Sequence, residues 1–305
     1  MKSLMNNLCV ICFTVICNLS LFSQQLDPDL VSISNSYTFK GNSELDINNL
    51  LLNSTFYKKT LQGGRAFLRV GLNYNFSSVD YKKNILNLNP NALNDMQRFH
   101  TFGLSVFYLK LLNKQWSVGG VLQPQLSSNF TSDLTINDFN PRVLAFINYI
   151  KNPKNRYNFG LSFMPNNGLG FPVIPFGSYW SMIGNKTQMS IGFPKTSITY
   201  SKSPKTSFIA MVRFDNFNYN LNDNIRLNQQ LLERLNYNEV VASIGVNKSL
   251  TDDLKFNLNL GYSLWRTFEF RNENSSETLT ELDVKNNFNL LFGFQFKPKK
   301  KTDKS

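Results

Sequence analysis

The sequence is poor in the side chains on which most enzymes depend. It has three cysteines and one histidine among 305 residues. The cysteines, Cys9, Cys12 and Cys17, all lie in an apolar N-terminal segment that is typical of a secretory leader. Without that leader the chain has no thiol, no disulfide and no cysteine ligand. A single imidazole, that of His100, also excludes sites that need two histidines, so we expect neither a metal nor a cofactor.

Long apolar runs are also lacking, except at the N-terminus. There the segment from Leu8 to Phe22 follows Lys2 and ends at Ser23, which predicts a signal peptide over residues 1–23 and a mature chain from Gln24. No later stretch reaches the roughly 18 apolar residues that a spanning helix needs, which excludes a helical membrane protein. A protein that crosses a membrane with strands is not excluded.

Acidic residues are scarce relative to basic ones. The 20 Asp and Glu residues face 32 Lys and Arg residues, for a formal net charge of +12. Much of the excess lies in the tail, residues 297–305, which we expect to be a solvated periplasmic end, either without a partner or touching anionic surfaces or lipid head groups. Nucleic acid is not an expected partner, because a secreted protein does not normally meet it. The basic residues of this tail are Lys297, Lys299, Lys300, Lys301 and Lys304.

What the sequence has in abundance is alternation of apolar and polar residues. The pattern is clear over Arg65–Phe76, Arg156–Phe163, Lys255–Trp265 and Phe288–Phe296. The polar positions are rich in Asn, Ser, Gly and Gln, which suits a wet lumen better than the charged surface of a soluble sandwich. The apolar positions are large, which suits lipid. We therefore predict an all-β fold, a transmembrane antiparallel up-and-down β-barrel over residues 24–296.

The connections alternate in length, as they do in outer-membrane barrels. With a first strand near Leu30–Phe39 they predict about 12 to 14 strands, with both chain ends in the periplasm. The count depends on Pro194, which marks either a tight outer turn or a bulge in one longer strand. The short links are Leu61–Gly64, Leu111–Lys114, Asn152–Asn155, Ile183–Lys186, Ser203–Lys205 and Ser249–Asp252. The longer stretches are Val79–Arg98, Ser128–Asn140, Pro165–Gly170, Phe217–Tyr237 and Arg271–Asp283.

Two further features concern the ends of this barrel. The stretch Phe217–Tyr237 contains spaced leucines after Asp223, a candidate N-cap, and predicts a short helix that either folds inward or caps the outer mouth. Aromatic residues fall mostly near the ends of the expected strands, where their rings suit the level of the lipid head groups. These residues are Trp116, Tyr149, Tyr157, Trp180, Tyr200 and Trp265.

Three segments carry a resemblance to a known family. They are GLGFPVIPFGSYW at Gly168–Trp180, MSIGFPKTSITYSKSPKTSFIAMVRF at Met189–Phe214, and NLGYSLWRTFEF at Asn259–Phe270. The proline-punctuated strand pair and the late Gly-Tyr strand that ends in an arginine resemble an uncharacterised family of outer-membrane β-barrel proteins of Gram-negative bacteria, a domain of unknown function. The resemblance implies a barrel in the cell outer membrane and implies no activity.

Basic residues dominate the charges on the expected lumen face. The candidates to line the lumen are Arg65, Arg69, Arg156, Arg213 and Lys255. A positive lumen would favour anions, so we predict a pore or passive transport protein for small polar or anionic solutes. The alternative is a closed structural or surface-interaction barrel whose outer loops carry the function.

We expect no enzymatic role. His100 shares the parity of lipid-facing residues at the outer end of a strand, and no nucleophile can be assigned to it from spacing. The expected partners are outer-membrane lipid, small polar solutes and, through the C-terminal strand, the barrel-assembly machinery.

Overall fold

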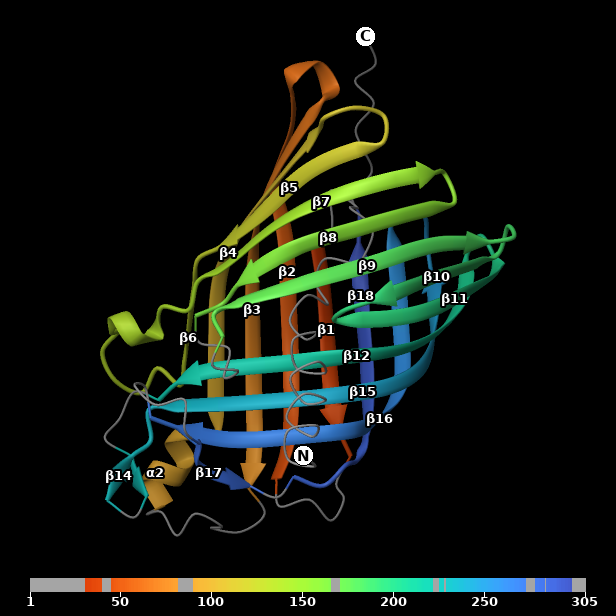
Figure 1. Ribbon diagram of the computed structural model, residues 1–305. Coiled ribbons are helices and arrows are strands. Elements are labelled where there is room, and N and C mark those ends of the chain that lie inside the picture. Colours follow the sequence, from red (N-terminus) through yellow and green to blue (C-terminus); the bar gives the residue numbers. More distant parts are fainter. Residues whose placement is uncertain are drawn as a thin grey trace, which may run out of the picture.

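Fourteen antiparallel strands close into a single barrel in the computed structural model (Figure 1). The ring closes where β1 (Val31–Thr38) pairs with β18 (Phe288–Phe296), with Val31 opposite Phe296. The predicted signal peptide and the tail beyond Lys297 lie outside the described residues. The structure describes residues 31–39, 45–81, 90–165, 171–221, 225–227, 229–272, 278–282 and 284–297.

Consecutive strands pair with one another all around the ring. A fifteenth segment, β6 (Gln125–Ser128), continues β5 after Pro124 and pairs with β4 as β5 does. The remaining strands of the ring are β2 Leu45–Leu61, β3 Ala66–Tyr81, β4 Arg98–Leu111, β5 Trp116–Gln123, β7 Arg142–Asn152, β8 Asn155–Phe163, β9 Val173–Ile183, β10 Thr187–Gly192, β11 Lys195–Ser203, β12 Thr206–Asn220, β15 Arg234–Ser249 and β16 Leu254–Arg271. The short elements between them are η1 Gln62–Gly64, α2 Pro90–Asp95, η2 Ile136–Asp138, β13 Arg226–Leu227, β14 Gln230–Leu231 and β17 Thr278–Leu282.

Pro194 marks a tight turn. It follows Phe193 through a cis peptide bond and joins β10 to β11, so the two segments are separate strands. The barrel therefore has the upper number of the predicted range. The predicted first strand is confirmed as β1.

The two ends of the barrel differ. One end has short turns, together with the start of β1 and the end of β18, and we call it the short-turn end. The other end, the long-loop end, holds α2, η2 and the small strands β13, β14 and β17 (Figure 1). The helix predicted within Phe217–Tyr237 is wrong for the residues that the structure describes. β12 and β15 continue their ladder as far as Asn220 opposite Arg234, and β13 and β14 form a small hairpin.

A belt of large apolar side chains covers the outside of the barrel. Leu72, Phe102, Phe159, Ile198 and Ile244 are each at least 50% exposed, and they come from β3, β4, β8, β11 and β15. Exposing such a belt to water would be unfavourable, whereas hydrocarbon solvates it and the closed ring leaves no unpaired strand edge. The outer surface is therefore suited to a lipid bilayer.

A row of aromatic rings borders this belt at the short-turn end. Ring centroids lie 4.6 Å apart between Trp116 and Tyr149, 6.1 Å apart between Tyr149 and Tyr157, and 5.0 Å apart between Tyr157 and Tyr179. Such rings suit the head-group region of a bilayer. Trp180 differs from the expectation, because strand alternation turns it to the inner face, where Arg156 lies over its ring.

The inside of the barrel holds an apolar cluster at its long-loop end. Strand residues and loop residues pack together there and fill the mouth. The Tyr81 hydroxyl donates to the carbonyl oxygen of Met96 at 3.2 Å, so its polar atom is satisfied within the cluster. The buried members are Leu45, Ile47, Val79, Tyr81, Met96, Phe99, Tyr219, Leu221, Ile225, Leu232, Leu235, Tyr237, Phe268, Phe270, Leu282 and Val284.

The barrel is pinched near this cluster. β12 runs beyond its neighbour β11 and reaches β6, although strands β7 to β11 separate the two around the ring (Figure 1). Asn220 pairs there with Ser128, and the Ser127 hydroxyl donates to the carbonyl oxygen of Asn218 at 2.7 Å. The outer part of β12 therefore closes one side of the lumen.

Candidate functional site: the polar lumen

A cavity of about 150 Å³ with mostly polar lining residues lies inside the barrel, on the inner face of β2 to β7. Its other wall is β12 from Phe214 to Tyr219, the part of the strand that crosses toward β6. The remaining lining residues are mostly amides: Leu51, Asn53, Asn73, Asn75, Thr101, Gln123, Gln125 and Arg142.

Strand register brings these amides to one level. Asn53 of β2 is opposite Asn73 of β3, Asn73 is opposite Gly103 of β4, and Gly103 is opposite Gln125 of β6. Cross-strand partners point to the same face of a sheet, so the side chains form a row around the inner wall. Gly103 lets its neighbours in the row approach closely, because a Cβ atom there would lie only 3.2 Å from Gln125 Cβ and 3.3 Å from Asn73 Nδ2.

Arg142 supplies a guanidinium to this wall. It begins β7 directly opposite Gln123 of β5, and both side chains line the cavity. Arg142 has no ion-pair partner among the described residues, so its guanidinium beside neutral amides makes this part of the lumen positive.

The part of β12 that crosses toward β6 is held by hydrogen bonds to β3 and by an ion pair within β12. Asn75 Nδ2 donates to the Tyr219 hydroxyl at 3.0 Å, and that hydroxyl also bonds the Ser77 hydroxyl. On β12 itself, Arg213 Nε donates to Asp215 Oδ2 at 2.7 Å. The charge of Asp215 is therefore already matched by Arg213.

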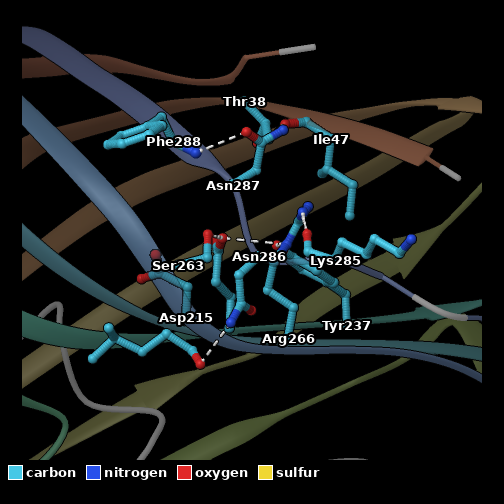
Figure 2. A network of polar contacts seen from close by, with 12 residues as sticks. Thr38, Ile47, Asp215, Tyr237, Ser263, Arg266, Lys285, Asn286, Asn287 and Phe288 are labelled. Carbon is cyan, nitrogen blue, oxygen red and sulfur yellow. Dashed lines mark hydrogen bonds and ion pairs between the residues drawn. The ribbon is translucent and has the colours of Figure 1, made fainter. Parts of the chain in front are cut away.

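A second polar network lies between β15, β16 and the segment before β18 (Figure 2). Arg266 Nε lies 3.4 Å from Glu239 Oε1 and donates to the Tyr237 hydroxyl at 3.1 Å, while its Nη1 donates to the carbonyl oxygen of Lys285 at 2.9 Å. The Ser263 hydroxyl donates to the same Glu239 carboxylate. Because the Arg266 side chain is 0% exposed and that of Glu239 is 7% exposed, we assign this pair a structural role in closing the interior.

The structure does not bring the five predicted lumen residues together. Arg65 lies in the turn between η1 and β3 with its side chain exposed, and Lys255 is exposed near the start of β16. Arg69 lies 5.1 Å from the ring centre of Phe107, and Arg156 lies 4.8 Å from that of Trp180. Arg213 alone borders the cavity residues, through Asp215. The contribution of all five residues to ion preference stays a prediction.

Sequence reasoning missed Arg142, Glu239 and Arg266. Arg142 follows the stretch that we expected to be a loop, and the alternation after it is too short to assign its face from sequence. Glu239 lies just beyond Phe217–Tyr237, which we interpreted as a loop although its ends continue the strands. Arg266 follows a register shift: Val240 pairs with Trp265 and Val241 with Ser263, so counting by twos along β16 places Arg266 on the wrong face.

His100 lies on the outer face of β4. Its Nδ1 is 2.9 Å from the Tyr74 hydroxyl, and its ring lies among those of Phe76, Phe102 and Phe130. Among the residues that the structure describes, no serine, threonine or cysteine side chain forms a hydrogen bond with it. The same residues contain no group of three acidic, histidine or cysteine side chains that could hold a metal ion.

Comparison with known proteins identifies the family. Residues 38–297 match the family described as Domain of unknown function (DUF6268). The chain belongs to this family. A search of curated proteins finds no match. In the described part of this DUF6268 protein, no helix is long and apolar enough to cross a membrane.

Several solved structures match most of this chain at very low identity. The FadL homologue of Pseudomonas aeruginosa is 9% identical with a TM-score of 0.43, over 88% of this chain and 90% of that one. LpxR from Salmonella typhimurium is 8% identical with a TM-score of 0.39, over 88% of this chain and all of the other. The KdgM porin, solved in complex with disordered oligogalacturonate, is 8% identical with a TM-score of 0.35 over the same shares.

Proposed function

We propose that this DUF6268 protein is an outer-membrane barrel that transports small polar or anionic solutes and has no enzymatic role. The observation that carries the proposal is the amide-lined cavity with Arg142 in its wall, inside a barrel with an apolar outer belt. Amides exchange hydrogen bonds with a passing polar solute, and the guanidinium favours anions.

The route is narrow. The apolar cluster fills the long-loop end, and the crossing part of β12 reduces the lumen next to this cluster. A wide, water-filled channel would need neither feature. We therefore expect selective passage with low conductance, in contrast to a general diffusion pore.

The same cluster favours a second candidate function. If it stays packed at all times, nothing crosses, and the barrel is a scaffold whose surface loops bind a partner. In that case the polar residues of the interior serve only as hydrogen-bond partners for one another.

Single-channel recording separates the two functions. The protein is folded in detergent, checked by heat-modifiable migration on a gel, and inserted in a planar bilayer. Small discrete steps with a reversal potential shifted toward anions would support transport. Silence from a correctly folded barrel would overturn transport and favour the scaffold.

The location and assembly partner complete the proposal. We infer that the chain is exported with its N-terminal leader removed and that barrel-assembly machinery recognises β18, whose Phe288, Phe292, Phe294 and Phe296 are exposed. Fractionation of cells tests the location. A protein recovered from the soluble fraction in folded form would contradict it.

A further inference from the structure

We propose that the lumen cavity is a binding site for a small hydroxylated carboxylate, with Arg142 as its charged anchor. This inference rests on the transport function proposed above and names the class of solute. Arg142 lines the cavity, yet its side chain makes no hydrogen bond and no ion pair with any residue that the structure describes. A half-buried cation without a counter-charge is unfavourable, so an anion is the group that the site lacks.

No carboxylate of the cavity wall is available to neutralise Arg142. Asp215 is the one acidic lining residue, and it accepts the 2.7 Å bond from Arg213. The wall therefore retains one surplus positive charge. Guanidinium binds carboxylate through two parallel hydrogen bonds, which gives orientation as well as attraction.

The amides around Arg142 define the rest of the ligand. The side chains of Asn53, Asn73, Gln123 and Gln125 line the cavity and have no hydrogen-bond partner among the described residues. Asn75 adds a buried acceptor: it is 9% exposed, its Nδ2 donates to Tyr219, and its Oδ1 has no partner in the described part of the chain. Each amide both donates and accepts hydrogen bonds, as a hydroxyl group also does. Hydroxyl groups on the ligand therefore supply the hydrogen-bond partners that these amides lack.

Other classes of ligand fit less well. An apolar molecule would take water away from the amides without replacing its hydrogen bonds. A metal cation would be repelled by Arg142 and would find no unpaired carboxylate among the described lining residues. A multiply charged phosphate would need more positive charge than the single unpaired guanidinium in that lining supplies.

Calorimetric titration of the protein in detergent micelles tests the site with a matched pair of probes. Gluconate carries a carboxylate and hydroxyl groups, and sorbitol replaces that carboxylate with a neutral hydroxymethyl group. We expect gluconate to bind more tightly than sorbitol. Arg142→Gln should weaken gluconate binding at least about tenfold, the value of a hydrogen bond to a charged group, and leave sorbitol unchanged. The control Arg98→Gln removes the same charge from an exposed residue outside the cavity and should change neither.

Three results would overturn the site: equal binding of the two probes, an equal loss in Arg98→Gln, or no binding of gluconate to a folded barrel. If Arg142→Gln does not fold, Asn53→Leu decides, because it removes a lining amide that has no partner among the described residues and should weaken both probes together. Unchanged binding in this variant would refute the site. Uptake into proteoliposomes keeps the two proposals separate. Binding without uptake refutes transport alone, and uptake without saturable binding refutes the site alone.

Discussion

Asn75 and Tyr219 lie 144 residues apart in the sequence and are joined inside the barrel by a 3.0 Å hydrogen bond. Asn75 belongs to β3, and Tyr219 belongs to the part of β12 that has left its neighbour β11. The ring of Tyr219 also stacks on that of Phe99 with centroids 4.9 Å apart. This contact joins two sides of the lumen, and both residues line the cavity.

The first prediction concerns this hydroxyl. Tyr219→Phe keeps the ring against Phe99 and leaves Asn75 and Ser77 without their shared partner. Loss of a buried hydrogen-bond partner costs about 1–3 kcal/mol, so we expect the free energy of unfolding to fall by that amount. Urea unfolding in micelles measures it. Tyr200→Phe, on the exposed outer face of β11, is the control and should have no effect.

The buried ion pair gives a second prediction. Glu239→Gln leaves the Arg266 guanidinium buried without its counter-charge, which costs about 3–5 kcal/mol in such pairs. We expect a corresponding drop in the urea midpoint. The double variant Glu239→Gln/Arg266→Met should be more stable than Glu239→Gln alone, because it leaves no unpaired charge. A double variant that is the less stable of the two would contradict the assigned role of the pair.

Alternation of side chains was sufficient to predict the barrel, because successive residues of each strand face lipid and lumen in turn. It also predicted the inner face for Arg69, Arg156 and Arg213, which lie against Phe107, Trp180 and Asp215 in the structure. Alternation could not place Arg65, because this residue lies in the turn after η1 and precedes the first residue of β3.

The contacts across the lumen could not be predicted in the same way. Pairing of Asn220 with Ser128 depends on two segments 92 residues apart, and no local pattern records such a contact. The cavity depends on this pairing, since β12 forms one of its walls. The sequence therefore indicated a polar lumen and gave no sign of a defined site within it.

Tryptophan fluorescence gives a third prediction, on the orientation of the wall. Trp116 is 41% exposed on the outer face, whereas Trp180 lies inside under Arg156. We expect lipids brominated on their acyl chains to quench a variant that retains Trp116 alone much more than one that retains Trp180 alone. Phenylalanine replaces the other tryptophans in each variant. Equal quenching would contradict the assignment of inner and outer faces.

The apolar cluster at the long-loop end gives the last prediction. Leu232 is 1% exposed within it, and its amide donates to the Ile225 carbonyl oxygen at 2.8 Å. Leu232→Asp places a charge where none can be solvated, which costs several kcal/mol unless the segment leaves the cluster. If the cluster limits the route, we expect a severalfold rise in single-channel conductance with the barrel still heat-modifiable. Ile136→Asp, at a side chain that is 81% exposed, is the control and should conduct as the unaltered protein does. Unchanged conductance in a folded Leu232→Asp barrel would mean that solutes do not pass this cluster.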